Sequence, residues 1–128
     1  MNTISAQAVQ RQNQDYTLLM NMLHVSVSKH LLDEHFTLIW ANDFYYDLIG
    51  YSQTEYEALY HNRPDLYYAE NLTDWQAIQR VVVDAITAGK PGYTTVTRMR
   101  RKSGEYVWVQ LAATFVEERI DGVQVAYT

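Results

Sequence analysis

Hydrophobic and polar positions change their spacing several times along the chain, and each spacing predicts a different element. Between Ala6 and Leu23 the apolar residues recur at intervals typical of a helix with one apolar side. Val25 and Val27 then alternate with polar residues between His24 and Asp33, and Phe36 to Trp40 is rich in β-branched and aromatic side chains. These two stretches favour a pair of strands joined by a tight turn.

The middle of the chain predicts helices, each started by a capping residue. Asn42 can accept a backbone N–H directly after the second strand, and Gly50 suits the left-handed end of the short helix that follows. Ser52 and Thr73 each open a sequence that matches a capping box. We therefore expect a short helix after Ser52 and a long one from Asp74 to Ala88.

Beyond Gly92 the apolar residues alternate again, which predicts three strands. Their sequences are YTTVTRMRR, EYVWVQLAATFVEE and VQVAY, and tight turns separate them. Strands joined in this way form an antiparallel meander, so the sheet combines strands from both ends of an α+β domain. In the middle strand Trp108 faces away from Val107 and Val109, and we expect it to be covered by another element rather than exposed.

Composition limits the kinds of site that the chain can carry. Its 128 residues are enough for one domain, and the absence of cysteine excludes disulfides, thiolate metal sites and cysteine nucleophiles. The net charge of −5 and the acidic middle of the chain, where the stretch from Asp33 to Asp84 holds ten acidic residues against only Arg63 and Arg80, do not suit a nucleic-acid partner. We assign the basic run from Arg98 to Lys102 to a solvated hairpin edge.

Neither a targeting signal nor an apolar run of membrane-spanning length is present in the sequence, so we predict a cytoplasmic domain without a membrane partner. The glycines are nearly all isolated at turns, and the four histidines lack the spacing of metal ligands on a helix. Asp43 and Asp47 fit an exposed acidic helix face better than a pair of catalytic acids. We expect no catalytic residue and no metal site.

The order of these elements resembles the PAS sensor domain, in the subgroup with an Arg…Asp-Gly…Tyr-x-Trp-Val signature. The resemblance spans about His24 to Tyr127. It depends on Asn42 after the second strand, on Arg98, and on the sequences IGYS and RKSGEYVWV. Ser103 stands where the family usually has aspartate, a change confined to a turn.

The resemblance implies a five-stranded antiparallel sheet with strand order 2-1-5-4-3 and with several short helices and one long helix on one face. It divides the chain into an N-terminal amphipathic helix at residues 1–23 and a sensor domain at residues 24–128 that ends within its last strand. It implies a non-enzymatic sensory and dimerisation module, taken from a larger bacterial signalling protein, that regulates an output domain. We favour a diguanylate cyclase over a histidine kinase as that output.

Members of this family hold haem, flavin, a small organic ligand or nothing. Haem binding usually requires a histidine on the long helix, and the light-sensing flavin type requires a cysteine; this chain offers neither. We therefore expect no haem or flavin, but a cavity that is empty or holds a small ligand. The residues proposed to line it, by their periodicity, are Trp40, Leu48, Ile78, Val82, Met99 and Leu111.

The N-terminal helix is the expected dimer element. Its apolar residues form a seam with heptad spacing, made of Val9, Tyr16, Leu19 and Leu23. A helix of this length is marginal in water by itself, so the seam must be covered by the sheet or by the same helix of a second copy. We predict a homodimer; a helix that caps the sheet of a monomer is the alternative.

Two other functions remain open from the residues alone. One is a small cone-shaped α+β enzyme of the ketosteroid-isomerase type, with an aspartate base and a tyrosine in an apolar pocket. The early strand pair between Val25 and Ala41 argues against that enzyme. The other is a structural interaction domain with a filled core, which the sequence does not separate from a sensor.

Overall fold

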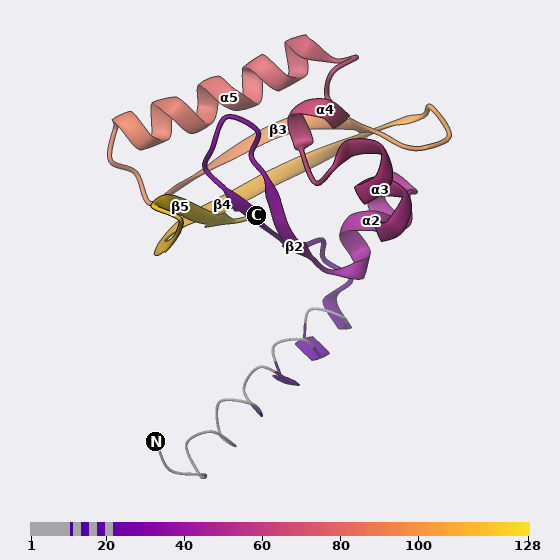
Figure 1. Cartoon of the computed structure of the whole chain (residues 1–128), viewed down its shortest axis with the longest axis horizontal. Helices are drawn as coiled ribbons and strands as arrows, with labels where there is room; N and C mark the ends of the chain where they lie inside the picture. The colour runs from indigo at the N-terminus through magenta and orange to yellow at the C-terminus, as the bar shows by residue number, and fades with distance from the viewer. Residues whose placement is uncertain (1–10, 12–13, 16–17, 20–21) are drawn as a thin grey trace.

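A computed structural model describes residues 11, 14–15, 18–19 and 22–128 of the chain. Within this part, five antiparallel strands form one sheet with helices on one side (Figure 1). The strands, in their order across the sheet, are β2 (Leu38–Ala41), β1 (Ser28–Leu31), β5 (Val123–Tyr127), β4 (Tyr106–Ile120) and β3 (Gly92–Arg100). The predicted fold class and the predicted strand order 2-1-5-4-3 are confirmed.

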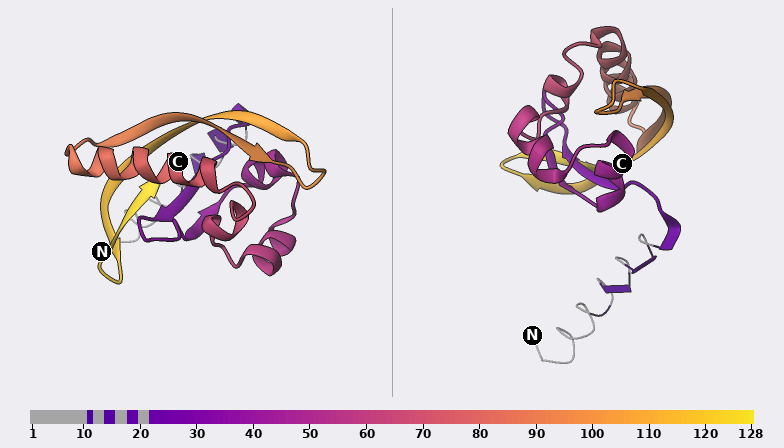
Figure 2. Two further views of the ribbon diagram at one scale, coloured as in Figure 1. Left: turned by 90° about the horizontal axis from the view of Figure 1, so that it is seen from above. Right: turned by 90° about the vertical axis from the view of Figure 1, so that its right-hand side faces the viewer.

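The helices fall into two groups on that side of the sheet. The short ones, α2 (Asp43–Ile49), α3 (Gln53–Tyr60) and α4 (Pro64–Tyr67), gather at one end, and the long α5 (Leu72–Thr87) lies along β3 (Figure 2). The predicted caps of α2 are present, because Asn42 accepts from the Tyr45 amide and Gly50 has a φ of 77°. Ser52 forms the capping box predicted for α3.

The start of α5 differs from the prediction. The helix begins at Leu72, and its N-cap Asn71 makes no side-chain capping hydrogen bond. The Asn71 carbonyl accepts from the Trp75 amide at 3.1 Å, so helical hydrogen bonding is already established where Thr73 was expected to start it. The predicted capping box at Thr73 is therefore wrong.

An irregular pairing between β1 and β2 decides where Trp40 lies. His30 pairs with Leu38 and Lys29 with Trp40, so Ile39 is an extra residue in β2. An extra residue of this kind is a β-bulge, and it reverses which face of the sheet the following side chains reach. Leu38 is buried, whereas Trp40 shares the outer face with Lys29 and is 44% exposed. The expectation that Trp40 points into the interior is wrong.

Trp108 also lies on the outer face of the sheet. It is 75% exposed, because helices α2 to α5 all pack on the opposite face and no described segment covers this one at Trp108. The prediction that Trp108 is covered within the monomer is therefore wrong. Its outward neighbour Val96, on β3, is 66% exposed.

The N-terminal seam is described only in part. Val9 and Tyr16 lie outside the described residues, while Leu19 and Leu23 are helical and exposed. The described residues of this segment therefore present apolar side chains to solvent.

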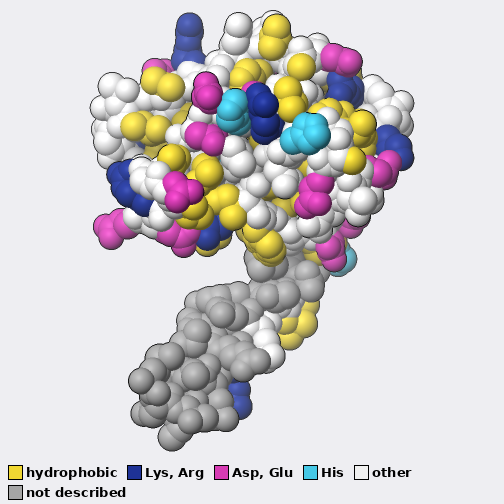
Figure 3. Space-filling view, in the orientation of Figure 1, with side chains coloured by type: hydrophobic (Ala, Val, Ile, Leu, Met, Phe, Trp, Pro, Cys, Tyr) yellow, Lys and Arg dark blue, Asp and Glu magenta, His cyan; other side chains and the backbone are white. Residues whose placement is uncertain are grey.

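Aromatic side chains fill much of the space between the sheet and the short helices. The tyrosines pack edge to face at ring-centroid distances of 4.9 to 5.9 Å in most of the pairs. The buried members are Tyr45, Tyr46, Tyr56, Tyr67, Tyr68 and Trp75. On the surface, acidic and basic side chains are interspersed over the face shown in Figure 3 rather than separated into patches.

Candidate functional site

A cavity of about 440 Å³ lies between the sheet and the helices. This volume is within the usual range for sites that bind small molecules. Five of the six residues proposed from periodicity line it together: Leu48, Ile78, Val82, Met99 and Leu111. The sixth, Trp40, does not. The cavity thus receives side chains from α2, α5, β3 and β4.

The few polar groups on the cavity wall include a chain of hydrogen bonds around His30. The carbonyl of Phe36 lies 2.8 Å from Nδ1 and can only accept, so Nδ1 carries the proton. Nε2 is then the acceptor for the Ser28 hydroxyl, also at 2.8 Å. Burial lowers the pKa of His30, which agrees with a neutral ring.

Tyrosine hydroxyls in and beside the wall add further polar groups to those of Ser26, Gln110 and Thr114. The Tyr45 and Tyr56 hydroxyls lie 3.2 Å apart and share a hydrogen bond. The Tyr67 hydroxyl donates to the Arg100 carbonyl at 2.5 Å. Tyr68 lines the cavity, and its hydroxyl has no hydrogen-bond partner among the described residues. Burial raises the pKa of both Tyr45 and Tyr68, so both remain protonated at neutral pH.

Ion pairs beside the cavity connect β3 to the helices. The Arg98 guanidinium donates to Asp74, in the first turn of α5, at 3.0 Å. Arg100 donates to Glu70, just before α5, at 2.7 Å. None of these four side chains lines the cavity, and no other Asp, Glu, Lys or Arg side chain does so in the described part of the chain. The wall is therefore uncharged.

The loop between β1 and β2 forms part of the wall. Phe36 has a φ of 50°, which is unusual for a bulky side chain. This backbone is held by the hydrogen bond from His30 and by one from the Phe36 amide to the Asp33 carbonyl at 3.3 Å. The Phe36 ring packs against Trp75 of α5 at a centroid distance of 4.9 Å. The loop thus crosses from the sheet to the helices over the cavity.

The cavity reaches the backbone of β4 where that strand is paired on one side. β5 pairs with β4 as far as Tyr127 opposite Thr114, and residues 106–113 of β4 pair only with β3 among the described residues. Both the outward Gln110 and the inward Leu111 line the cavity. The wall therefore includes this edge of β4 and the segment before β1, which contributes Val25.

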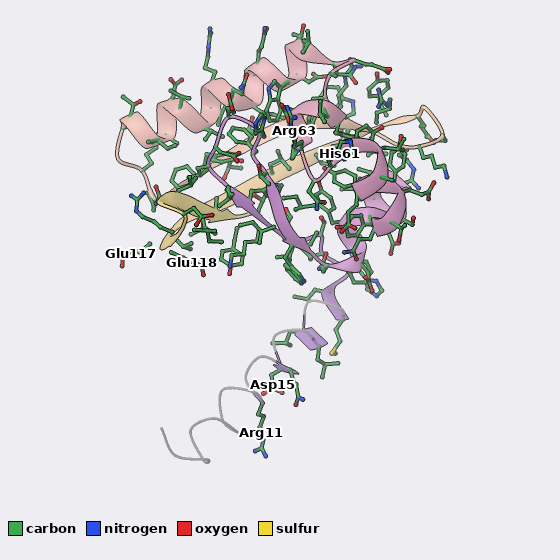
Figure 4. All side chains as sticks on the ribbon, viewed as in Figure 1. Arg11, Asp15, His61, Arg63, Glu117 and Glu118 are labelled. Carbon is green, nitrogen blue, oxygen red and sulfur yellow. The ribbon has the colours of Figure 1, made fainter. Side chains whose placement is uncertain are left out.

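Ionisable side chains outside the cavity do not form a second site. Asp43 and Asp47 are exposed, as predicted. His35 and Arg63 both contact Asp65 at 2.9 Å. In Figure 4, Arg63 lies near α4, while Glu117 and Glu118 lie at the far end of the sheet. In the described residues no three His, Cys, Asp or Glu residues are grouped to hold a metal, and no helix is long and apolar enough to cross a membrane.

Sequence analysis missed most of the polar and aromatic cavity residues. Trp75 was identified only as part of the apolar face of the long helix. His30 was identified only as a histidine without metal-ligand spacing and Phe36 only as the start of a strand, and no local pattern marked Tyr68. Tyr68 and Phe36 lie in loops, where periodicity does not predict which way a side chain points.

The sequence and the fold both match those of known proteins. A family model described as PAS fold matches residues 38–126. The structure is similar to a PAS domain from Colwellia psychrerythraea, with a TM-score of 0.53, 18% sequence identity, and coverage of 79% of this chain and 80% of that one. A PAS domain from Desulfitobacterium hafniense has a TM-score of 0.53 and 11% identity, with coverage of 84% and 93%.

A third similar structure belongs to an RNA-binding light-oxygen-voltage receptor, with a TM-score of 0.56 and 20% identity. The match covers 88% of this chain, which spans 32% of that receptor. No curated protein matches the sequence. At these identities the structural likenesses define the fold.

Proposed function

The chain belongs to the PAS family, and from this premise we propose that it is a cytoplasmic sensory module whose cavity binds a small ligand. The observation that carries the proposal is the cavity of about 440 Å³ with an apolar, uncharged wall. A purely structural domain would fill this space with side chains, because an empty cavity destabilises a fold. An isomerase of the kind considered above would need an aspartate base, and among the residues that the structure describes no aspartate side chain lines the cavity.

We further propose that the occupant is neither haem nor flavin. His30 lines the cavity, but hydrogen bonds to Phe36 and Ser28 engage both of its ring nitrogens, so neither is free for an iron. No histidine occurs between Leu72 and Thr87 in α5. The chain contains no cysteine for a flavin adduct. These residues do not fit a haem ligated by His30 or by α5, or a flavin that forms a cysteinyl adduct.

Signal output in this proposal starts from the contacts between α5 and the sheet. A ligand in the cavity touches α5 through Ile78 and Val82 and touches β4 through Leu111. A change in the distance between α5 and β4 would be transmitted through β4 to the outer face of the sheet. There, exposed Trp108 would meet the N-terminal segment 1–23, which we propose as a dimer element separate from the sensor at 24–128.

For the output domain, the family resemblance favours a diguanylate cyclase in a bacterial signalling protein, with a histidine kinase as the second choice. The proposal includes no catalysis by this domain, no membrane partner and no nucleic-acid partner. The net charge of −5 and the mixing of acidic with basic side chains on the face in Figure 3 argue against a nucleic-acid partner.

Native mass spectrometry of freshly purified protein tests the ligand proposal. We expect an ion heavier than the chain mass, which returns to the chain mass when the same sample is denatured. The mass difference gives the size of the ligand. If the native mass equals the chain mass, and if extracts of the producing cells do not raise the melting temperature, the cavity is not a ligand site in this protein.

A further inference from the structure

The hydroxyl of Tyr68 is a hydrogen-bonding group that the protein leaves without a partner inside its cavity. Tyr68 is 6% exposed, and its ring stacks on Trp75 with centroids 5.6 Å apart and planes at 27°. In the described residues every fully enclosed side-chain nitrogen or oxygen has a partner. The Tyr68 oxygen, for which no partner is found there, is therefore not fully enclosed, and Tyr68 lines the cavity.

Several other tyrosines of the aromatic cluster do have partners for their hydroxyls. The Tyr45 hydroxyl is paired with that of Tyr56, the Tyr60 hydroxyl with that of Tyr51 at 3.0 Å, and the Tyr67 hydroxyl with a backbone carbonyl. Because Tyr68 lines the cavity and no protein partner is found for its hydroxyl, this group can form a hydrogen bond with a bound molecule. Because burial raises its pKa, the phenol keeps its proton and can donate it.

The cavity wall around the Tyr68 hydroxyl disfavours the binding of a charged ligand. No Asp, Glu, Lys or Arg side chain lines the cavity in the described residues, and the hydrogen bonds of His30 keep its ring neutral. An ionised ligand would lose its hydration without gaining a counter-charge, at a cost that real proteins rarely sustain. The rings of Phe36, Tyr68 and Trp75 instead offer flat apolar surfaces.

We propose that the cavity binds an uncharged aromatic molecule that carries a hydrogen-bond acceptor, and that the Tyr68 hydroxyl donates to this acceptor. The inference rests on the ligand-sensing function proposed above and specifies its ligand class. Carboxylates, amines and phosphates are excluded by the same wall. Tyr68 is then the residue that separates a polar aromatic ligand from a hydrocarbon of the same shape.

Three probes of similar size test the proposal by isothermal titration calorimetry: methyl naphthyl ketone, isopropylnaphthalene and naphthoate. The ketone has an acceptor, the hydrocarbon has none, and the naphthoate is charged. Each is titrated into the full chain and into the variants Tyr68→Phe and Tyr60→Phe. Tyr60 is the matched control, because it is also a tyrosine of the aromatic cluster but does not line the cavity.

We expect the ketone to bind the unmodified chain at least about 100-fold more tightly than naphthoate. Tyr68→Phe should weaken ketone binding about 3- to 10-fold, the worth of one neutral hydrogen bond, and leave isopropylnaphthalene unchanged. Tyr60→Phe should change neither.

Three results would overturn the inference: equal binding of naphthoate and ketone, a ketone affinity unaffected by Tyr68→Phe, or no binding of any probe. The first two leave the sensory proposal intact, because the cavity would still hold a ligand. If no probe binds, the native mass measurement decides separately whether the sensory proposal also fails.

Discussion

His30 is a histidine that the fold keeps neutral. Phe36 accepts its Nδ1 proton, Ser28 donates to Nε2, and Tyr45 packs edge-on at 6.5 Å between ring centroids. A second proton on the ring would reverse the hydrogen bond with Ser28, so that Nε2 donates, and would place a charge beside the apolar cavity. At this position one residue connects the stability of the protein to pH.

We predict that the free energy of unfolding decreases as the pH falls through the ordinary histidine value of 6.5. Burial lowers the pKa of His30 in the folded state, so below pH 6.5 the unfolded chain binds a proton that the folded chain does not. The contribution of His30 to the free energy of unfolding is fully present above pH 6.5. It is lost as the pH falls from 6.5 towards the lower pKa of His30 in the folded state. Urea unfolding at several pH values measures this dependence.

The variant His30→Asn provides the control for that measurement. It keeps a donor for the Phe36 carbonyl, costs about 1 to 3 kcal/mol at neutral pH, and should flatten the dependence near pH 6.5. Burial favours a raised pKa for Asp65, but hydrogen bonds from Arg63 and His35 outweigh it and lower the pKa. Asp65 therefore loses its stabilising effect only in more acidic solution, and does so equally in both proteins. If the free energies of unfolding of the two proteins change with pH in the same way near pH 6.5, this pH dependence does not come from His30.

Between the second strand and the first short helix, the junction depends on Asn42. Its side-chain oxygen accepts from the amides of Val27 at 3.0 Å and Tyr45 at 3.3 Å, and its amide donates to the Val25 carbonyl at 2.8 Å. One buried side chain thus caps α2 and also holds the segment before β1. The first strand, the second strand and α2 are connected through it.

We predict that Asn42→Ala lowers the free energy of unfolding by about 2 to 4 kcal/mol, since it removes a cap and leaves buried backbone groups unpaired. Ser52→Ala at the exposed cap of α3 should cost about 1 kcal/mol. Asn42→Asp keeps the acceptor and loses the donor, so we expect an intermediate loss. Urea denaturation compares the three; equal losses for Asn42→Ala and Ser52→Ala would show that Asn42 acts only as a cap.

Elements with a local signal were predictable from the sequence. The caps Asn42, Gly50 and Ser52 identify α2 and α3, and β5 begins and ends where the alternation does, at Val123 and Tyr127. Trp40 was not predictable, because the bulge at Ile39 arises from pairing with β1 and leaves no mark in the alternation. The same holds for Tyr68, since its loop has neither helical nor strand periodicity.

Across the whole molecule, one sheet face packs against helices and the other carries exposed apolar side chains. The alternation in β4 correctly separates Trp108 from Val107 and Val109, but which of the two sets is covered depends on where helices distant in the sequence pack. Trp108 and Val96 on the outer face, and Leu19 and Leu23 in the N-terminal segment, all remain solvent-exposed. Exposed apolar surfaces of this kind mark contacts.

We predict that two copies cover these surfaces in a dimer. Trp108→Ala should cost less than about 1 kcal/mol of folding stability, as expected for an exposed residue, but should weaken association by more than about 2 kcal/mol. Sedimentation compares the full chain, this variant, a chain starting at His24, and the control Leu59→Ala, whose side chain is equally apolar and 57% exposed on α3.

A full chain that stays monomeric at tens of micromolar would contradict the dimer. If the chain starting at His24 dimerises as well as the full chain, the N-terminal segment is not the dimer element. If Trp108→Ala associates normally, the outer sheet face is not the interface.

The different surroundings of the three tryptophans give this protein an internal optical probe. Trp75 is buried and stacked on Tyr68, while Trp40 and Trp108 are exposed. An indole in an apolar enclosure emits at shorter wavelength than a hydrated one, so the blue part of the fluorescence spectrum comes from Trp75. The packed tyrosines pass their excitation energy to this nearby indole. Light absorbed by the buried tyrosines is therefore emitted by Trp75 at the cavity wall. The long-wavelength part of the spectrum comes from Trp40 and Trp108 on the outer sheet face.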